Sequence, residues 1–127
     1  VGETFEEHGR VEQVLKKQLD EGLSGVERSG VIIAYEPLWA IGPGRPTPTA
    51  AEIRSIVRYI KSVAECPVVY GGGLKESNAE MIASIPELDG GLIALTRFQG
   101  EIGFYPEEYL RIVEKYLGCA DASAHIA

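Results

Sequence analysis

The chain has 127 residues, about one domain, of which 45% are hydrophobic and 24% charged, a balance typical of globular proteins and not of disordered ones. Its formal net charge of −7 comes without any basic cluster, which argues against nucleic acid as a partner. No apolar run approaches the roughly 18 residues of a membrane span, and no signal-like leader opens the chain. We therefore expect a soluble cytoplasmic protein without a membrane partner, with Cys66 and Cys119 as free thiols.

Helical and strand patterns alternate along the chain. Amphipathic segments with the helical period predict helices, and short, continuously apolar, β-branched runs predict strands that are buried on both faces. In chain order the patterns predict a helix at 10–23, a strand at 31–35, a helix at 49–65, a strand at 67–70, a helix at 77–85, a strand at 91–95 and a helix at 105–118.

Two helix starts have the spacing of a capping box, in which a hydroxyl and a glutamate three residues later bond each other's backbone amides. They are Thr49 with Glu52, and Ser77 with Glu80. The last helix is expected to end at Gly118, because glycine is favoured just past a helix end.

Strands that alternate with helices predict a parallel α/β architecture. No linker or low-complexity segment interrupts the pattern, so we expect one domain at 1–118 and a loose tail at 119–127. In such folds ligands bind at the carboxyl ends of the strands, which directs attention to the residues that follow each strand.

Glu36 follows the first strand, Gly71, Gly72 and Gly73 follow the second, and Arg97 lies just after the third. Glu36, among apolar neighbours, is suited to a general base, although a strand-end glutamate that caps a helix or pairs with arginine explains it equally well. The glycines offer amides to a phosphate, but a tight turn that needs positive φ is the more economical explanation.

The stretch AYEPLWAIGPGR, residues 34–45, has the rigid prolines, apolar middle and glycine tip of a lid that excludes water, although an ordinary loop would also fit. This stretch closely resembles the catalytic loop of the triosephosphate isomerase family, AYEPVWAIGTGK. YGGG at 70–73 resembles the family's YGGS, DGGLIAL at 89–95 its DGFLVGG, and VGET at 1–4 its CIGE segment. The resemblance implies the C-terminal half of a (β/α)8 barrel, from the end of strand five through helix eight.

The resemblance also implies roles for individual residues. Glu36 matches the base that moves a proton between adjacent carbons of a sugar phosphate. The amides of Gly42 and Gly73 match phosphate contacts, and the Tyr70 hydroxyl matches the group that latches the closed lid. The lid itself corresponds to Pro37, Leu38, Trp39, Ala40, Ile41 and Gly42, and the apolar clamp on the base to Ile41 and Leu92.

The chain departs from the family after the third strand. Ala94 and Leu95 replace paired glycines whose amides bind phosphate, and the segment TRFQGEIGFYPEEY, 96–109, is longer than the family's turn. Arg97 is a candidate for the missing anion contact, as a charge-assisted bidentate donor. YGGGLKE and GGLIALTRF resemble a related branch that acts on four-carbon ketose phosphates such as erythrulose phosphate.

The family's lysine and proton-shuttling histidine belong to the first half of the barrel, and neither His8 nor His125 occupies a matching motif. We therefore expect the chain by itself to be inactive, and to need a companion N-terminal half or self-association, with a homodimer as the complete enzyme. The expected substrate is a phosphorylated three- or four-carbon sugar, without cofactor or metal. Two alternatives remain: a non-catalytic half-barrel, either a folding fragment or a phosphate-binding module, and another phosphate-binding barrel such as an aldolase or epimerase.

Overall fold

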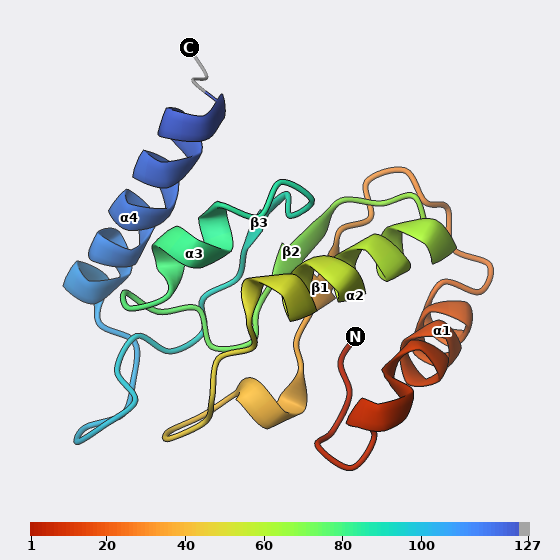
Figure 1. Ribbon diagram of the computed structural model, residues 1–127, viewed down its shortest axis with the longest axis horizontal. Helices are drawn as coiled ribbons and strands as arrows, with labels where there is room; N and C mark the ends of the chain where they lie inside the picture. Colours follow the sequence, from red (N-terminus) through yellow and green to blue (C-terminus); the bar gives the residue numbers. More distant parts are fainter. Residues whose placement is uncertain (125–127) are drawn as a thin grey trace.

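The computed structural model describes residues 1–124 of the chain. At its centre lies a parallel sheet in the order β1 (Ile33–Tyr35), β2 (Val68–Tyr70) and β3 (Gly90–Gly91) (Figure 1). The register pairs Tyr35 with Tyr70, and Tyr70 with Gly91. The predicted α/β class with parallel strands is thus confirmed.

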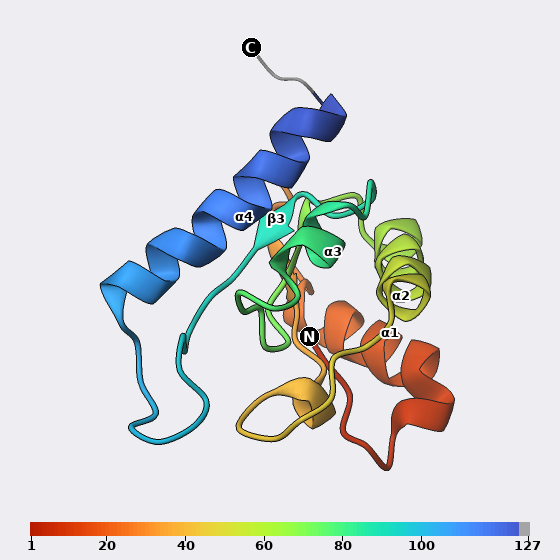
Figure 2. The same ribbon diagram turned by 60° about the vertical axis from the view of Figure 1, so that its left-hand side comes forward.

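Helices follow each strand and build one apolar core. Alternate strand residues, Ile33 and Tyr35 in β1 and Val68 and Tyr70 in β2, are buried in the same cluster as apolar side chains from every α-helix. Figures 1 and 2 show α1 and α2 on one side of the sheet, with α3 beside α4 beyond β2. The helices and 3-10 turns are η1 (His8–Arg10), α1 (Val11–Gly22), η2 (Leu38–Ala40), α2 (Ala50–Val63), α3 (Ala79–Ala83) and α4 (Pro106–Ala124).

The opposite face of the sheet is open. Ile32 is 65% exposed and Leu92 is 45% exposed, although both belong to predicted strands. The prediction that these strands are buried on both faces is therefore wrong for the described residues, because the helices that follow the strands all pack on the other face.

The N-terminal segment extends the sheet beyond β1. The Val1 nitrogen donates to the Ala34 carbonyl (2.7 Å), the Glu36 amide to the Val1 carbonyl (2.7 Å) and the Leu38 amide to the Glu3 carbonyl (2.9 Å). Such alternating bonds are those of a parallel pair. Residues 1–3 are thereby fixed beside the strand that carries Glu36.

Three predicted boundaries are corrected. The third strand is confined to Gly90–Gly91, since after the bond from the Leu92 amide to the Tyr70 carbonyl (2.9 Å) the chain leaves the sheet. The cap of α3 is Asn78, without a side-chain cap hydrogen bond, so the predicted box of Ser77 and Glu80 is wrong. The last helix passes Gly118 and continues to Ala124 through an alanine-rich stretch that favours helix.

One predicted helix start is confirmed, and the predicted C-terminal tail stays a prediction. The capping box of Thr49 and Glu52 is confirmed, with both of its hydrogen bonds at 3.1 Å. The division into a domain at 1–118 and a tail at 119–127 stays a prediction, and His125 lies outside the described residues. Within residues 1–124, no helix has the length and apolar character needed to cross a bilayer.

Candidate active site

The segments that follow the three strands gather at one end of the molecule. Figures 1 and 2 both place the loop after β1, the loop after β2 and the loop after β3 at the lower edge, together with the turn that precedes η1. This edge is the carboxyl end of the parallel sheet, where side chains from different strands can act on one ligand. All of the predicted site residues belong to these loops or to the strand ends beside them.

Glu36 lies at this edge, directly after β1. Because Tyr35 pairs with Tyr70, the next residues in register are Glu36 and Gly71. A Cβ on Gly71 would lie 2.9 Å from Cγ of Glu36 and 3.3 Å from its Oε2. The partly buried Glu36 side chain therefore lies across the start of the glycine loop, in space that only a glycine at position 71 leaves open.

The glycine loop, residues 71–73, is shaped by close packing as well as by turn geometry. A Cβ on Gly72 would lie 2.8 Å from Cδ of Pro37, and would also meet the Tyr70 hydroxyl. Gly73 has φ +86°, and a Cβ there would lie 2.9 Å from the Ala40 carbonyl oxygen. Of the three glycines, Gly73 is the one that needs positive φ. Gly72 is needed because a side chain there would collide with Pro37 at the start of the lid.

The lid begins as a packed turn and becomes exposed toward its tip. Pro37 and Ala40 are buried, whereas Leu38 in the turn η2 is 54% exposed. Ile41 and Gly42 are partly buried, and the following residues 43–46 are exposed. Gly42 has φ +110°. The clamp of Ile41 and Leu92 on Glu36 stays a prediction.

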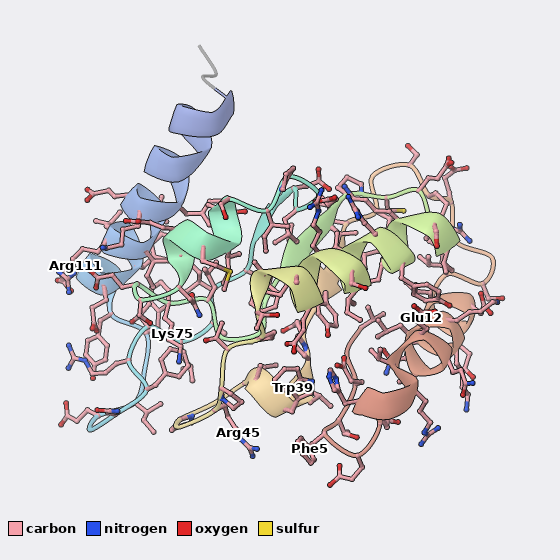
Figure 3. The ribbon with its side chains drawn as sticks, in the orientation of Figure 1. Phe5, Glu12, Trp39, Arg45, Lys75 and Arg111 are labelled. Carbon is pink, nitrogen blue, oxygen red and sulfur yellow. The ribbon has the colours of Figure 1, made fainter. Side chains whose placement is uncertain are left out.

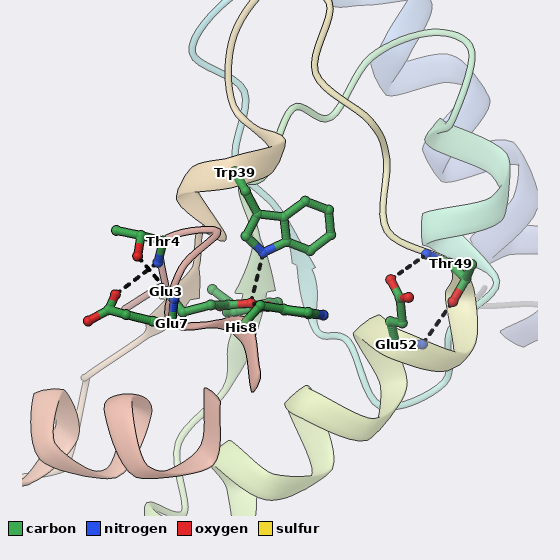
Figure 4. Close-up of polar contacts among 8 residues, drawn as sticks. Glu3, Thr4, Glu7, His8, Trp39, Thr49 and Glu52 are labelled. Carbon is green, nitrogen blue, oxygen red and sulfur yellow. Dashed lines mark hydrogen bonds and ion pairs between the residues drawn. The ribbon is translucent and has the colours of Figure 1, made fainter. Parts of the chain in front are cut away.

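A buried carboxylate beneath the lid is the feature that the sequence did not single out. Glu3 is fully buried and accepts hydrogen bonds from Nε1 of Trp39 (2.9 Å) and from the Tyr35 hydroxyl (3.0 and 3.1 Å). Nδ1 of His8 lies 3.0 Å from the same carboxylate (Figure 4). This glutamate belongs to the motif VGET, whose resemblance indicated the end of a strand but not a buried carboxylate. His8 is exposed, with Glu3 as its partner.

Both buried tyrosines of the strands are held in their neutral form. Burial, with the Glu3 carboxylate second, raises the pKa of Tyr35 above its usual range. Burial likewise raises the pKa of Tyr70, again with a contribution from Glu3. The Tyr70 hydroxyl donates to the Gly72 carbonyl (2.8 Å), within its own loop. Its role as the latch of a closed lid stays a prediction.

The longer segment after β3 folds into a hairpin closed by a bridge between Arg97 and Gly103. The Arg97 guanidinium bonds Glu108 (3.1 Å) and stacks 3.7 Å above the Tyr105 ring. Ala94 is exposed and Leu95 is partly buried. The charge of Arg97 is therefore already paired in this structure, and its contact with phosphate stays a prediction, as do those of the backbone at Ala94 and Leu95.

Two other cations belong to this edge. Nζ of Lys75 lies 4.9 Å from the centre of the Phe98 ring, which joins the glycine loop to the hairpin, and Arg45 projects from the exposed part of the lid (Figure 3). In the part of the chain that the structure describes, no three His, Cys, Asp or Glu side chains lie together in the way a metal site requires. The edge thus brings together the carboxylate of Glu36, the glycine loop and the cations of Lys75 and Arg45.

Comparison with known proteins agrees with this geometry. Residues 1–115 match the family model "Triosephosphate isomerase". Among curated relatives, the triosephosphate isomerases of Prochlorococcus marinus (strain MIT 9211) and Nostoc punctiforme (strain ATCC 29133 / PCC 73102) are each 38% identical to the chain, over 88% and 92% of its length. That of Synechococcus sp. (strain JA-3-3Ab) is 36% identical over 89%.

The matches cover only part of those relatives, 45%, 47% and 44% of their respective lengths. The chain therefore spans less than half the length of the curated relatives it matches. The family model and the relatives nevertheless agree over nearly the whole of the chain. The chain belongs to the triosephosphate isomerase family.

Proposed function

We propose that the chain is the C-terminal half of a (β/α)8 sugar-phosphate isomerase, in which Glu36 is the base. Its carboxylate takes a proton from the carbon beside the substrate carbonyl, which leaves an enediolate, and returns it to the former carbonyl carbon, while a second proton passes from the hydroxyl oxygen to the former carbonyl oxygen. The reaction is redox-neutral overall, since one C–H bond breaks and another forms, and it needs no electron carrier. The substrate is a phosphorylated three- or four-carbon sugar.

One observation carries the proposal: the Glu36 side chain lies against Gly71, at the start of the same loop that ends in Gly73. A carboxylate and a loop of glycines thus lie side by side at the carboxyl edge of the sheet, which supports the role of Glu36 as base beside a phosphate site. Amides free of side chains suit a phosphate, and the lid that starts at Pro37 can exclude water from the intermediate.

The described residues contain no counterpart of the family's lysine and histidine at this edge. Electrophilic stabilisation of the enediolate is a large part of such catalysis, so we infer that the rest of the barrel supplies it. The open face of the sheet, with Ile32 and Leu92 exposed, is the surface on which that complement would pack. The complement is a companion N-terminal half or a second copy, and the complete enzyme is a homodimer.

The substrate's length is the finer part of the proposal. Relative to the family's motif, the hairpin at 96–105 and the pair Ala94 and Leu95 stand in place of a short glycine turn, so we infer a phosphate end of different shape. We propose that this change accommodates a four-carbon ketose phosphate, with the triose phosphate as the second candidate.

Solvent deuterium incorporation, followed by NMR in D2O, tests both parts. Dihydroxyacetone phosphate and erythrulose phosphate are incubated with the chain alone and with the chain plus an N-terminal half. We expect exchange only with the complemented protein, and faster into the four-carbon substrate. Glu36→Gln should abolish exchange and leave binding of inorganic phosphate nearly unchanged.

Two results would contradict the proposal. Exchange that persists in Glu36→Gln would remove Glu36 from the role of base. Phosphate binding without exchange into either sugar, even with an N-terminal half present, would favour the alternative of a non-catalytic phosphate-binding half-barrel.

A further inference from the structure

The chain from the lid's first residues to Thr47 is linked to Gly73 of the glycine loop at both of its ends, directly at the front and through Asn78 at the rear. At the front end, Ala40 is buried and its carbonyl oxygen would lie 2.9 Å from a Cβ on Gly73. At the rear end, Nδ2 of Asn78 donates one hydrogen bond to the Gly73 carbonyl (2.9 Å) and another to Oγ1 of Thr47 (3.2 Å). A single side chain therefore connects the rear of the lid to the loop against which the front is packed.

Asn78 is well fixed for this purpose. Its side chain is only 6% exposed, and its Oδ1 accepts a hydrogen bond from the Lys75 amide (2.8 Å). The carboxamide thus has partners for both its donor and its acceptor ends, which determines its orientation. The residue also precedes the first turn of α3, so it cannot move without disturbing that helix.

The segment between the two attachments has the properties of a moving part. Residues 43–46 are exposed, and Gly42 and Gly44 have φ +110° and +70°. Beyond Thr47 the chain is fixed again, because Pro48 is buried and Thr49 caps α2. The stretch free to move in the proposal below is therefore 41–46, bounded by Ala40 and Thr47.

We propose that Asn78 is a positioning residue, which holds the rear end of the lid on the glycine loop through Thr47. The inference rests on the proposed function, in which the amides of Gly42 and Gly73 bind one phosphate. With Ala40 packed against Gly73 and Thr47 bonded to it through Asn78, the tip of the lid moves between two fixed ends and returns to the same place over that loop. The hydrogen bond between Asn78 and Thr47 thereby limits how far the lid opens.

The test replaces Thr47, because this changes the tether and leaves the bonds of Asn78 to Gly73 and Lys75 in place. Thr47→Val removes the hydroxyl at nearly constant volume, and Thr47→Ser keeps it. Thr49→Val is the matched control, since it is the same substitution two residues away and removes the helix cap instead. If Thr47→Val fails to fold, Thr47→Ala serves as the second variant.

Selective ¹⁵N-glycine labelling provides the reporters, since Gly42, Gly44 and Gly73 are among the chain's 15 glycines. Relaxation dispersion measures microsecond-to-millisecond lid motion without ligand, and titration with inorganic phosphate follows the Gly73 amide. We expect Thr47→Val to raise the population of the open lid and weaken phosphate binding, each by about two- to tenfold, the range for loss of one hydrogen bond. Thr47→Ser should restore both, and Thr49→Val should change neither.

The possible outcomes separate this inference from the proposed function. Lid motion at Gly42 and Gly44 that is the same in Thr47→Val as in the unchanged chain overturns the tether, whether or not phosphate binds. Lid motion that changes equally in Thr49→Val also overturns it, because the effect would then follow from general loss of stability. Absence of any phosphate shift at Gly73 contradicts the phosphate site of the proposed function, while the relaxation data still decide on the tether.

Discussion

The indole Nε1 of Trp39 donates a hydrogen bond to Oε2 of Glu3 over 2.9 Å, between residues that are 36 positions apart. Trp39 lies in the first turn of the lid, and Glu3 lies in the segment that pairs beside β1. The carboxylate is fully buried, and Tyr35 and His8 are its other partners. The front of the lid is therefore joined to the core by the buried Glu3 side chain, in addition to the backbone bond from Leu38 to Glu3.

Replacement of Glu3 by glutamine should loosen this attachment. An amide turns one acceptor oxygen into a donor that faces the donors of Trp39 and Tyr35, and hydrogen bonds to a charged group contribute about 1.5–3 kcal/mol each. We expect Glu3→Gln to lower the free energy of unfolding by about 2–3 kcal/mol, measured by urea denaturation with Trp39 fluorescence as the signal. The exposed Glu6→Gln is the control, and equal losses in the two variants would contradict the role of Glu3.

Alkaline pH should destabilise the fold through its buried tyrosines. Burial raises the pKa of Tyr35 and Tyr70, whereas in the unfolded chain both titrate near the ordinary value of about 10. Their contribution to stability is therefore complete below about pH 10 and falls as the pH rises further, by about 1.4 kcal/mol per pH unit for each tyrosine. Urea denaturation at pH 8, 10 and 11 measures the decline. Tyr70→Phe should lessen the slope, and an unchanged slope would argue against the assignment.

The two capping boxes predicted from sequence give a paired test of helix starts. Thr49 and Glu52 form both hydrogen bonds of the box (Figure 4), so Thr49→Ala should lower the free energy of unfolding by about 1 kcal/mol. Ser77 makes no such cap, so Ser77→Ala should change it by no more than about 0.5 kcal/mol. Thermal unfolding of both variants measures the difference, and a larger loss in Ser77→Ala would show that the cap forms in solution.

Local patterns predicted the parts of the fold that depend on neighbours in sequence. The helical period and the box of Thr49 with Glu52 placed α2 to within a residue or two, and the apolar runs placed β1 and β2. The position of Glu36 at a strand end was also a local signal, whereas its role as base came from the resemblance and stays a prediction. The box of Ser77 was wrong, since Asn78 occupies the N-cap position one residue later, and its side chain bonds the Gly73 carbonyl and does not cap the helix.

Such local patterns did not predict the contacts between segments that are distant in the sequence. In the sequence, nothing distinguishes Glu3 from an exposed glutamate. Only the pairing of residues 1–3 with β1 buries it near Trp39. The glycine loop shows the same limit: the need for a turn was predicted, but Gly71 is explained by its register with Glu36. The exposure of Ile32 and Leu92 was also beyond such patterns, because an apolar run does not show which of its faces the helices will cover.

Gly71→Ala tests whether the position of Glu36 matters more than its presence. The added Cβ would lie 2.9 Å from Cγ of Glu36, so the carboxylate must shift while its chemistry stays the same. A displacement of about 1 Å costs on the order of 100-fold in rate, so in the complemented enzyme we expect kcat to fall by about that factor with phosphate binding retained. Gly9→Ala, where a Cβ meets nothing within 4 Å, is the matched control and should leave kcat unchanged. An unchanged kcat in Gly71→Ala would mean that catalysis does not depend on the position that the Glu36 side chain takes against Gly71.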